Sequence, residues 1–355
     1  MTYKTLLGKS DFLESLRGKT ASFYLSASYT QSSDIEGISQ AGLKGLLHLT
    51  PVLDFEFLCV QEVRSLENIA VTPSGIPTPA IITRAVHTLK AFASLEFLDL
   101  GVKKLPKLEH FPIHNFDISF SHAINTKTTI NAFDIFQKGL EFGKTHKSPG
   151  EYTILAESVP AGTTTANALC LALGYEVENK FSSSFKNAPN KIKDTLIKEA
   201  LVLCEKKVDI FEKAAQSADN MLIFNAGFVL GQSSTNKKLI LAGGTQMAAV
   251  LLLVNSIVKE MNVAFDASNL AICTTKWLEK DENSDFIGIL KLLDFNINAY
   301  ASTFDFQNSS SKVLKKYDEG EAKEGVGAGA ALCYAAINNI KEEELLEKIQ
   351  HFVGE

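Results

Sequence analysis

Residues 152–174 read YTILAESVPAGTTTANALCLALG, which is an apolar run, a turn of small residues and a helical segment in direct succession. The run YTILAES (152–158) is β-prone and largely apolar, as is typical of a strand buried on both faces of a parallel sheet. The segment TTTANALCLALG (163–174) ends in a glycine, the residue that most often closes a helix. The stretch therefore predicts a strand–turn–helix unit.

Similar apolar runs recur along the chain, with plausible helices between them. One helix is predicted over residues 191–216, where apolar residues follow the i, i+3, i+4 spacing and charges lie on the opposite face. The alternation predicts an α/β fold with a doubly wound, mostly parallel sheet, a three-layer Rossmann-like architecture. The other predicted strands are ASFYLSAS (21–28), DFEFLCV (54–60), NMLIFNAG (220–227), KLILAGG (238–244), NLAICTT (269–275) and NINAYAST (296–303).

The composition indicates a soluble globular protein of 355 residues, 45% of them hydrophobic and 21% charged. The net charge of −6 argues against binding to nucleic acid or to an anionic membrane, since both need a basic face. Residues 1–20 lack the uninterrupted apolar run of a signal peptide. Five cysteines with apolar neighbours and no CxxC spacing indicate reduced core thiols, so we expect a cytoplasmic protein.

Small residues and hydroxyls follow three of the predicted strands. Glu157 and then SVPAGTTTANAL (158–169) come after the first, GGTQMAAV (243–250) follows another, and Ser302 and Thr303 end a third. In open α/β sheets, ligands bind beyond the carboxyl ends of the strands. Each segment alone reads equally well as a tight turn, but together they predict a site for a phosphate or carboxylate group.

Other motifs do not meet the requirements of the chemistry that they suggest. EGVGAGA (324–330) fits the dinucleotide pattern GxGxxG/A, but no strand precedes it and too little chain follows. The turn after Glu157 lacks the GK[ST] of a nucleotide-hydrolysing loop. His110, His114 and His122 with Asp117 suggest a metal site, but Pro112 breaks the helix that would align the first two histidines and no HExxH is present, so no metal is expected. No cofactor is expected either.

Three motifs in a fixed order carry a resemblance to a known family: ILAESVPAGTTTANAL (154–169), ILAGGTQMAAVLLL (240–253) and KEGVGAGAAL (323–332). Together they resemble the nicotinate-nucleotide–dimethylbenzimidazole phosphoribosyltransferase family of cobamide (vitamin B12-type) assembly. The closer match is to its divergent branch of related proteins from archaea and some bacteria. The resemblance covers about residues 150–335, while the first 150 residues align only loosely.

The resemblance implies that a phosphoribosyl group moves from nicotinate mononucleotide to an aromatic base, giving nicotinate and an α-ribazole-type phosphate. The pyridinium is already a good leaving group, so the reaction needs one general base for the incoming N–H and carboxylates near an oxocarbenium-like centre. The base accepted is either a benzimidazole or a purine, and part of its pocket is expected in PSGIPTPAIITRA (73–85).

Glu324 matches the catalytic glutamate of the family and Glu157 its second acid. An apolar pocket would raise the pKa of Glu324, whereas a helix N-terminus and Lys323 would lower it. Locally, Glu324 also reads as a first-turn acid, Glu157 as a turn residue and Lys193 as a solvated charge on an amphipathic helix. Residues expected to bind the phosphate and nucleotide are Gly162, Thr163, Thr164, Lys193, Gly243, Gly244, Thr245, Gln246, Ser302, Thr303 and Gly325.

The family also implies a homodimer and two domains in each chain. A large nucleotide-binding domain is expected over residues 25–305, and a small helical domain carrying Glu324 over residues 1–24 plus 306–355. The usual histidine and acid near Ser302 are missing, which leaves the ribose contacts open. Two alternatives stand beside the transferase: a non-catalytic nucleotide-binding protein of the same fold, and a transferase or phosphorylase acting on another nucleotide.

Overall fold

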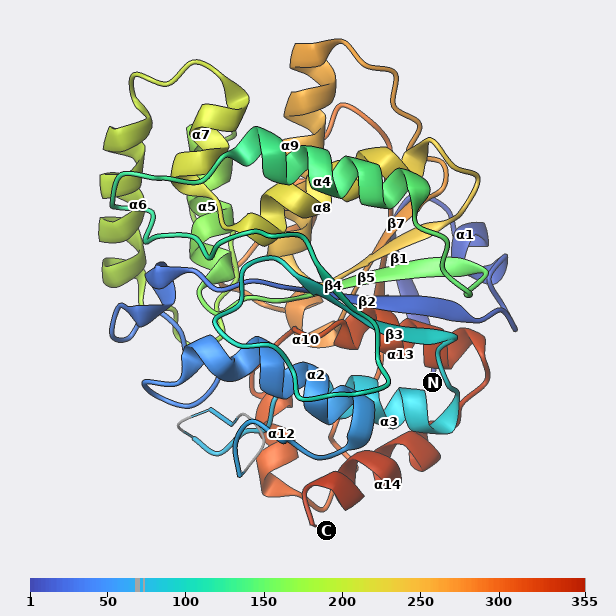
Figure 1. Ribbon diagram of the computed structural model, residues 1–355. Coiled ribbons are helices and arrows are strands. Elements are labelled where there is room, and N and C mark those ends of the chain that lie inside the picture. Colours follow the sequence, from blue (N-terminus) through green and yellow to red (C-terminus); the bar gives the residue numbers. More distant parts are fainter. Residues whose placement is uncertain (68–70, 73, 355) are drawn as a thin grey trace.

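The computed structural model describes residues 1–67, 71–72 and 74–354, which build one eight-stranded sheet in the order β1-β8-β7-β6-β5-β2-β3-β4 (Figure 1). Neighbouring strands are parallel except for β1, which pairs antiparallel with β8. The strands are β1 (Tyr3–Leu7), β2 (Ala21–Ala27), β3 (Ser94–Asp99), β4 (Ile113–Asn115), β5 (Tyr152–Ser158), β6 (Leu239–Ala242), β7 (Leu270–Thr274) and β8 (Asn298–Ser302).

Helices cover both faces of the sheet, which gives the three predicted layers (Figure 1). One face carries α4 (Ala132–Thr145), α5 (Gly162–Ala172), α7 (Ile210–Ser217), α8 (Asn220–Ser233), α9 (Thr245–Met261) and α11 (Phe286–Leu290), with α6 (Asn190–Cys204) outside α5 and α7. The other carries α1 (Asp11–Glu14), α2 (Thr50–Val60), α3 (Ala80–Leu89), α12 (Lys312–Asp318), α13 (Ala328–Ile337) and α14 (Glu342–Phe352). A short helix, α10 (Lys276–Glu279), follows β7, and 3-10 turns lie at Gln31–Asp34 and Leu47–Leu49.

The order of the strands shows where a ligand would bind. From β2 the chain moves outward to β3 and β4, then returns to β5 on the other side of β2 and continues to β6, β7 and β8. The direction of winding therefore changes between β2 and β5. In doubly wound sheets, the crevice at the carboxyl ends of such strands is the usual binding site.

Two of the predicted strands are wrong, because residues 54–60 lie in helix α2 and residues 220–227 in helix α8. Almost every residue of both helices is buried, so neither shows the polar face that distinguishes a helix from a buried strand. The start of α8 carried a usable signal: Asp219 caps it by accepting hydrogen bonds from the N–H groups of Met221 (2.9 Å) and Leu222 (3.2 Å).

Three strands were not predicted, namely β1, β3 and β4. The single helix expected over residues 191–216 is two helices, α6 and α7, separated by residues 205–209. At the amino terminus, β1 extends the sheet at its edge, while α13 packs on β6, β7 and β8. The division into a large domain and a small domain drawn from both chain ends stays a prediction.

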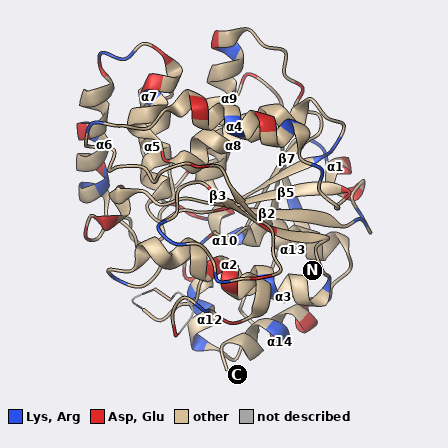
Figure 2. Cartoon of the chain, viewed as in Figure 1, with Lys and Arg blue, Asp and Glu red and all other residues tan. Residues whose placement is uncertain are grey.

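Charged residues of both signs are intermixed along the outer helices α4, α6 and α14 (Figure 2). Within the described part of the chain, all helices are too short or too polar to cross a bilayer. The five cysteines are free and buried, as the sequence predicts. Their apolar surroundings raise the pKa of the thiols of Cys59 and Cys170, which makes both poor nucleophiles.

Candidate active site

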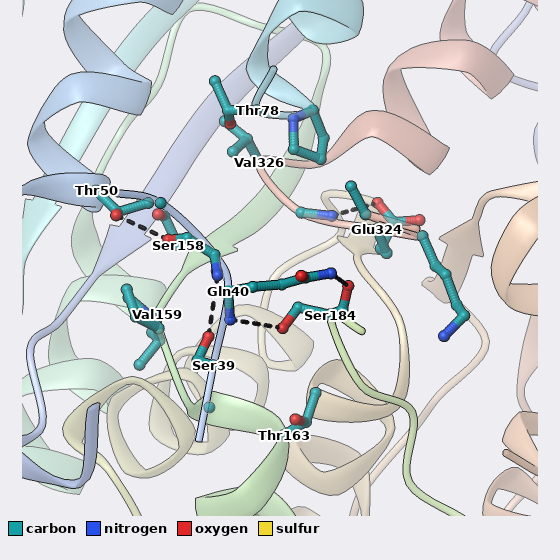
Figure 3. Close-up of a pocket in the computed structure, with 18 of the residues that line it drawn as sticks. Ser39, Gln40, Thr50, Thr78, Ser158, Val159, Thr163, Ser184, Glu324 and Val326 are labelled. Atoms are coloured by element: carbon teal, nitrogen blue, oxygen red, sulfur yellow. Dashed lines mark hydrogen bonds between the residues drawn. The ribbon is translucent and has the colours of Figure 1, made fainter. Parts of the chain in front are cut away.

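A cavity opens at the carboxyl ends of the central strands, where the winding of the sheet changes direction. Its walls come from the segments that follow β2, β5 and β6, from the start of α2, from the loop before α3 and from the loop between α12 and α13. About 970 Å³ of space lies between these walls, open solvent included. Figure 3 shows Thr78, Ser158, Thr163 and Glu324 around it.

Glu324 lies in the loop between α12 and α13, and four donors hold its carboxylate. Oε2 accepts hydrogen bonds from the hydroxyl of Thr274 (3.1 Å) and the N–H of Thr275 (2.9 Å). Oε1 accepts from the N–H groups of Gly325 (3.3 Å) and Gly329 (3.1 Å). Burial nevertheless outweighs these donors and raises the pKa of Glu324 to about 7. The apolar pocket therefore prevails over the helix N-terminus.

The loop that carries Glu324 is held in place by its backbone. Val326 has a left-handed conformation with φ of 50°, which is strained for a β-branched residue. Its N–H donates to the backbone oxygen of Glu157 (3.1 Å), and its own carbonyl accepts from the hydroxyl of Thr83 (2.8 Å). These bonds place Glu324 over the end of β5, where the second predicted acid lies.

Glu157 ends the central strand β5 and lines the same cavity, with only 4% of its surface exposed. Burial is the largest cause that raises its pKa, and the negative charges of Glu324, Asp219 and Asp54 raise it further, to about 8. Because the charge of Glu324 contributes, the two carboxyls titrate as a pair. With pKa values raised to about 8 and about 7, the pair shares protons near neutral pH instead of being fully ionised.

Two helix N-termini point at the cavity, as the small-residue turns predict. At the start of α5, Gly162 and Thr163 line the wall, and at the start of α9 the wall consists of Gly244, Thr245 and Gln246. Neither helix has a side chain that caps its first turn. Their N–H groups and dipoles therefore favour an anion at this place.

Gln246 packs directly over the backbone of Gly162. A Cβ atom at position 162 would lie 1.8 Å from the Oε1 atom of Gln246, so a larger residue there would displace the amide group of Gln246. That Oε1 atom is buried and has no hydrogen-bond partner among the described residues. An unpaired buried acceptor in the cavity wall is suited to a ligand hydroxyl, because satisfying it removes a desolvation cost.

Lys193 is not a solvated charge, because only 8% of its surface is exposed. From α6 its ammonium group donates to the hydroxyl of Thr163 (3.2 Å) and to the carbonyl of Ser182 (3.4 Å). Burial and the nearby charge of Lys323 lower its pKa to about 8, although Asp281 opposes this. The lysine is thus held beside the first turn of α5 and is mostly charged at neutral pH.

The other predicted binding residues lie at different distances from the cavity. Gly325 lines it, whereas Thr164 is fully buried behind it. A Cβ atom at Gly243 would lie 3.8 Å from the Cγ atom of Glu157, so this glycine adjoins the acid without lining the wall. The structure does not bring Ser302 and Thr303 to the cavity. They lie at the end of β8, beside β1, where Thr303 bonds to Thr2 and Ser302 to Phe304.

The loop expected to receive the base contributes Ile76, Pro77, Thr78 and Pro79 to the cavity. Pro73, which begins the predicted segment, lies outside the described residues. Its helical part, from Ala80 onward, belongs to α3 and does not line the wall.

Asp54 is a functional candidate that the sequence reading missed, because it assigned the residue to a strand. In α2 its carboxylate accepts from the hydroxyls of Thr78 (2.6 Å) and Ser158 (2.7 Å). Burial raises its pKa to about 6, and these two bonds partly offset the rise. No motif in the sequence connects the three residues, since only the fold brings α2, the loop before α3 and β5 together.

A second missed feature is the buried ion pair of Lys323 and Asp281, whose charged atoms are 3.4 Å apart. Lys323 also donates to the carbonyls of Ser183 (3.1 Å) and Phe185 (3.0 Å), while Asp281 accepts from the hydroxyl of Ser182 (2.7 Å). Lys323 is therefore engaged with the segment 182–185 and does not set the pKa of its neighbour Glu324. In the sequence, the only sign of a role for Lys323 was its position next to Glu324.

Comparison with known proteins places the chain among archaeal relatives. No family model matches it. It is 35% identical over 358 residues to a UPF0284 protein of Sulfurisphaera tokodaii, a match that covers 99% of this chain and 97% of the relative. It is 32% identical over 351 residues to a UPF0284 protein of Methanocaldococcus jannaschii, with 97% and 96% covered.

Among solved structures, it is similar to nicotinate-nucleotide–dimethylbenzimidazole phosphoribosyltransferase from Thermus thermophilus. The TM-score is 0.61 at 15% identity, and the match covers 97% of this chain and 92% of that one. The predicted doubly wound α/β fold is confirmed, and so is the resemblance that the three motifs indicated.

Proposed function

The chain belongs to the UPF0284 family, and we propose that it is a phosphoribosyltransferase. In this proposal it moves the phosphoribosyl group of nicotinate mononucleotide to a benzimidazole or purine base, for assembly of the cobamide nucleotide loop. One observation carries the proposal: two carboxyls with raised pKa values, the buried Glu157 and the half-buried Glu324, line a cavity that also receives two uncapped helix N-termini. A protein that only binds nucleotides needs no such acids.

The 5′-phosphate is assigned to the start of α5 and α9. There the N–H groups of the first turns, the hydroxyl of Thr163 and the ammonium group of Lys193 supply donors and positive charge. Gln246 offers its unpaired Oε1 atom to a ribose hydroxyl. Fixing the phosphate and ribose orients C1′ toward the glutamates, and this orientation itself lowers the barrier.

The incoming base is assigned to the apolar side of the cavity, where Ile38, Val71, Ile76 and Pro77 lie. Its ring nitrogen attacks C1′ while the bond from C1′ to the pyridinium nitrogen breaks, and nicotinate leaves with that electron pair. The N–H proton of the base passes to the carboxylate of Glu324. A pKa of about 7 suits this step, because a general base works best when its pKa lies near the working pH.

Glu157 is assigned an electrostatic role and a role in orienting ribose. Held mostly neutral near pH 7 by burial and by the charge of Glu324, it presents a hydroxyl donor to the sugar. The negative charge of Glu324 faces the cationic centre that develops at C1′. We further propose that the protein acts in the cytoplasm as a homodimer, without a metal or cofactor in this reaction.

The test is to incubate the protein with nicotinate mononucleotide and, separately, dimethylbenzimidazole, benzimidazole and adenine. Chromatography should detect released nicotinate, and NMR should show an α-configured nucleotide. Binding of nicotinate mononucleotide without transfer to any base would support the non-catalytic alternative. Consumption of another nucleotide, or cleavage by inorganic phosphate, would support the third alternative.

The phosphate assignment is tested with a matched pair of lysines on α6. Lys193→Met should raise the KM for nicotinate mononucleotide about 10- to 100-fold with a smaller effect on kcat, as expected for the loss of a charge-assisted hydrogen bond. Lys198→Met, which removes an exposed lysine of the same helix, should leave both constants unchanged. Equal effects of the two substitutions would contradict the assignment.

A further inference from the structure

Glu96, His114 and His146 form a cluster outside the cavity that the proposed reaction does not use. Glu96 lies in β3, His114 in β4, and His146 directly after α4. Glu96 Oε2 lies 2.7 Å from the Nε2 atom of His114 and 3.1 Å from that of His146. The sequence reading grouped His114 with His110 and His122 instead, and it placed no residue of β3 nearby.

The three side chains present one ligand atom each, and these atoms lie within 4.8 Å of one another. In a tetrahedral site with bonds of about 2.0–2.1 Å, neighbouring ligand atoms are roughly 3.4 Å apart. The imidazoles therefore need to move by on the order of 1 Å to share an ion with the carboxylate. Rotation of partly exposed side chains accommodates such a shift.

Aromatic packing and a hydrogen bond from a neighbouring residue already orient the three side chains of the cluster. The ring of Phe142 stacks on His146 with centroids 4.4 Å apart and lies 4.9 Å from the ring of His114. The hydroxyl of Ser94 donates to the other carboxylate oxygen of Glu96 (2.6 Å), which leaves Oε2 for the imidazoles. In known metal sites, hydrogen bonds from residues outside the ligand set, like this one from Ser94, fix the orientation of the ligands.

The charge and exposure of the cluster suit a cation. The imidazoles of His114 and His146 contact Oε2 of Glu96, and the hydroxyl of Ser94 donates to its Oε1, so all three partners converge on one carboxylate. His146 is the C-cap residue directly after α4, where the helix dipole favours positive charge. The Glu96 side chain is 4% exposed, whereas His114 and His146 are 23% and 26% exposed, which leaves room for water ligands.

We propose that Glu96, His114 and His146 bind a first-row divalent transition-metal ion, with Zn²⁺ as the best match. Two imidazole nitrogens and one carboxylate oxygen are a donor set of zinc sites, whereas Mg²⁺ and Ca²⁺ prefer oxygen ligands alone. The ion would join β3 and β4 to the end of α4, at the edge of the sheet. This inference is independent of the proposed transferase activity.

The test starts from full-length protein freed of metal by a chelator. Calorimetric titration with Zn²⁺ should show one ion per chain, and Co²⁺ should give the visible absorption of a site with nitrogen ligands. His114→Ala should weaken Zn²⁺ binding at least about 100-fold, since even loss of an outer-shell partner costs 10- to 100-fold. Zn²⁺ should also raise the Tm of the native protein but not that of the variant.

The matched control is His122→Ala, which removes a partly buried histidine bonded to Gln31 and outside the cluster. It should bind Zn²⁺ like the native protein. If His114→Ala fails to fold, X-ray absorption of the native zinc complex decides, because it reports whether two imidazoles and one carboxylate surround the ion. The proposal is overturned by equal binding in His114→Ala, by binding only at millimolar Zn²⁺, or by a different ligand set.

Discussion

At Glu324, three influences on one carboxyl group compete. The N-terminal end of α13 and the four hydrogen-bond donors favour the charged form, while burial under the cavity wall favours the neutral form. Burial prevails and leaves a pKa of about 7. The same donors also fix the position of the carboxylate, so the group combines a defined geometry with the basicity that proton abstraction needs.

We expect Glu324→Gln to bind nicotinate mononucleotide within about threefold of the native affinity but to lose roughly 100- to 10 000-fold in kcat. The amide keeps the shape of the side chain and cannot take a proton. Steady-state kinetics and calorimetry measure the two effects, with Glu319→Gln, an exposed acid near the end of α12, as the control. Full activity of Glu324→Gln would eliminate it as the base.

The activity of the native protein should rise with pH through about 7. Glu324 must be ionised to act, and its pKa has that value, so the ascending limb of kcat/KM belongs to this group and its coupled neighbour Glu157. The residual activity of Glu324→Gln should lack the limb. An unchanged limb in the variant would assign it to another group.

Among the described elements, helices α4 and α8 pack with their backbones in close approach. Gly139 and Gly143 of α4 face Gly227 and Gly231 of α8, and the backbones approach so closely that side chains are excluded. A Cβ atom at Gly231 would lie 2.1 Å from the carbonyl oxygen of Leu140. The two helices pack in the same hydrophobic core, on the same face of the sheet, as α5 and α9, whose N-termini point at the cavity.

Gly231→Ala should therefore destabilise the protein by about 3 kcal/mol, at the upper end for overpacking, since the atoms it meets are backbone atoms. Alanine is otherwise the better helix former, so propensity alone predicts a small gain. Urea unfolding of the variant, compared with Glu141→Ala on the exposed side of α4, measures the effect. A variant as stable as the native protein would show that the helices can separate.

For the whole molecule, the buried acids couple stability to pH. The pKa of Glu157 is about 8 in the folded protein, against an ordinary value of 4.5. As the pH rises above about 4.5, the unfolded chain releases this proton first, so the free energy of unfolding falls until the pH reaches about 8. Asp54 and Glu324, with raised pKa values of about 6 and 7, act in the same direction.

Glu157→Gln should remove part of this dependence. The variant should be more stable than the native protein at pH 8, by on the order of 3 kcal/mol, and similar to it at pH 4.5. Urea unfolding at both pH values measures the difference, with Glu141→Gln as an exposed control. Parallel stability profiles for Glu157→Gln and the native protein would mean that this carboxyl titrates normally.

The sequence by itself determined the strand–turn–helix units around residues 152–174 and 238–250, because apolar runs, glycines and small residues act locally. From these and the ordered motifs followed the fold class and the expectation that Glu157 and Glu324 share a site. For segments that are buried on all sides, the sequence did not distinguish a helix from a strand. A helix such as α8 is apolar on all sides, so its pattern does not differ from that of a central strand.

Only the tertiary structure decided which side chains meet and how they titrate. Asp54 with Ser158, Lys193 with Thr163, and Glu96 with two histidines come from elements far apart in the chain. Desolvation depends on everything that surrounds a group, so the pKa of Glu324 could not be read from Lys323 and the following glycines. Local sequence sets the elements, whereas long-range packing sets the dielectric surroundings and the distances on which the proposed chemistry depends.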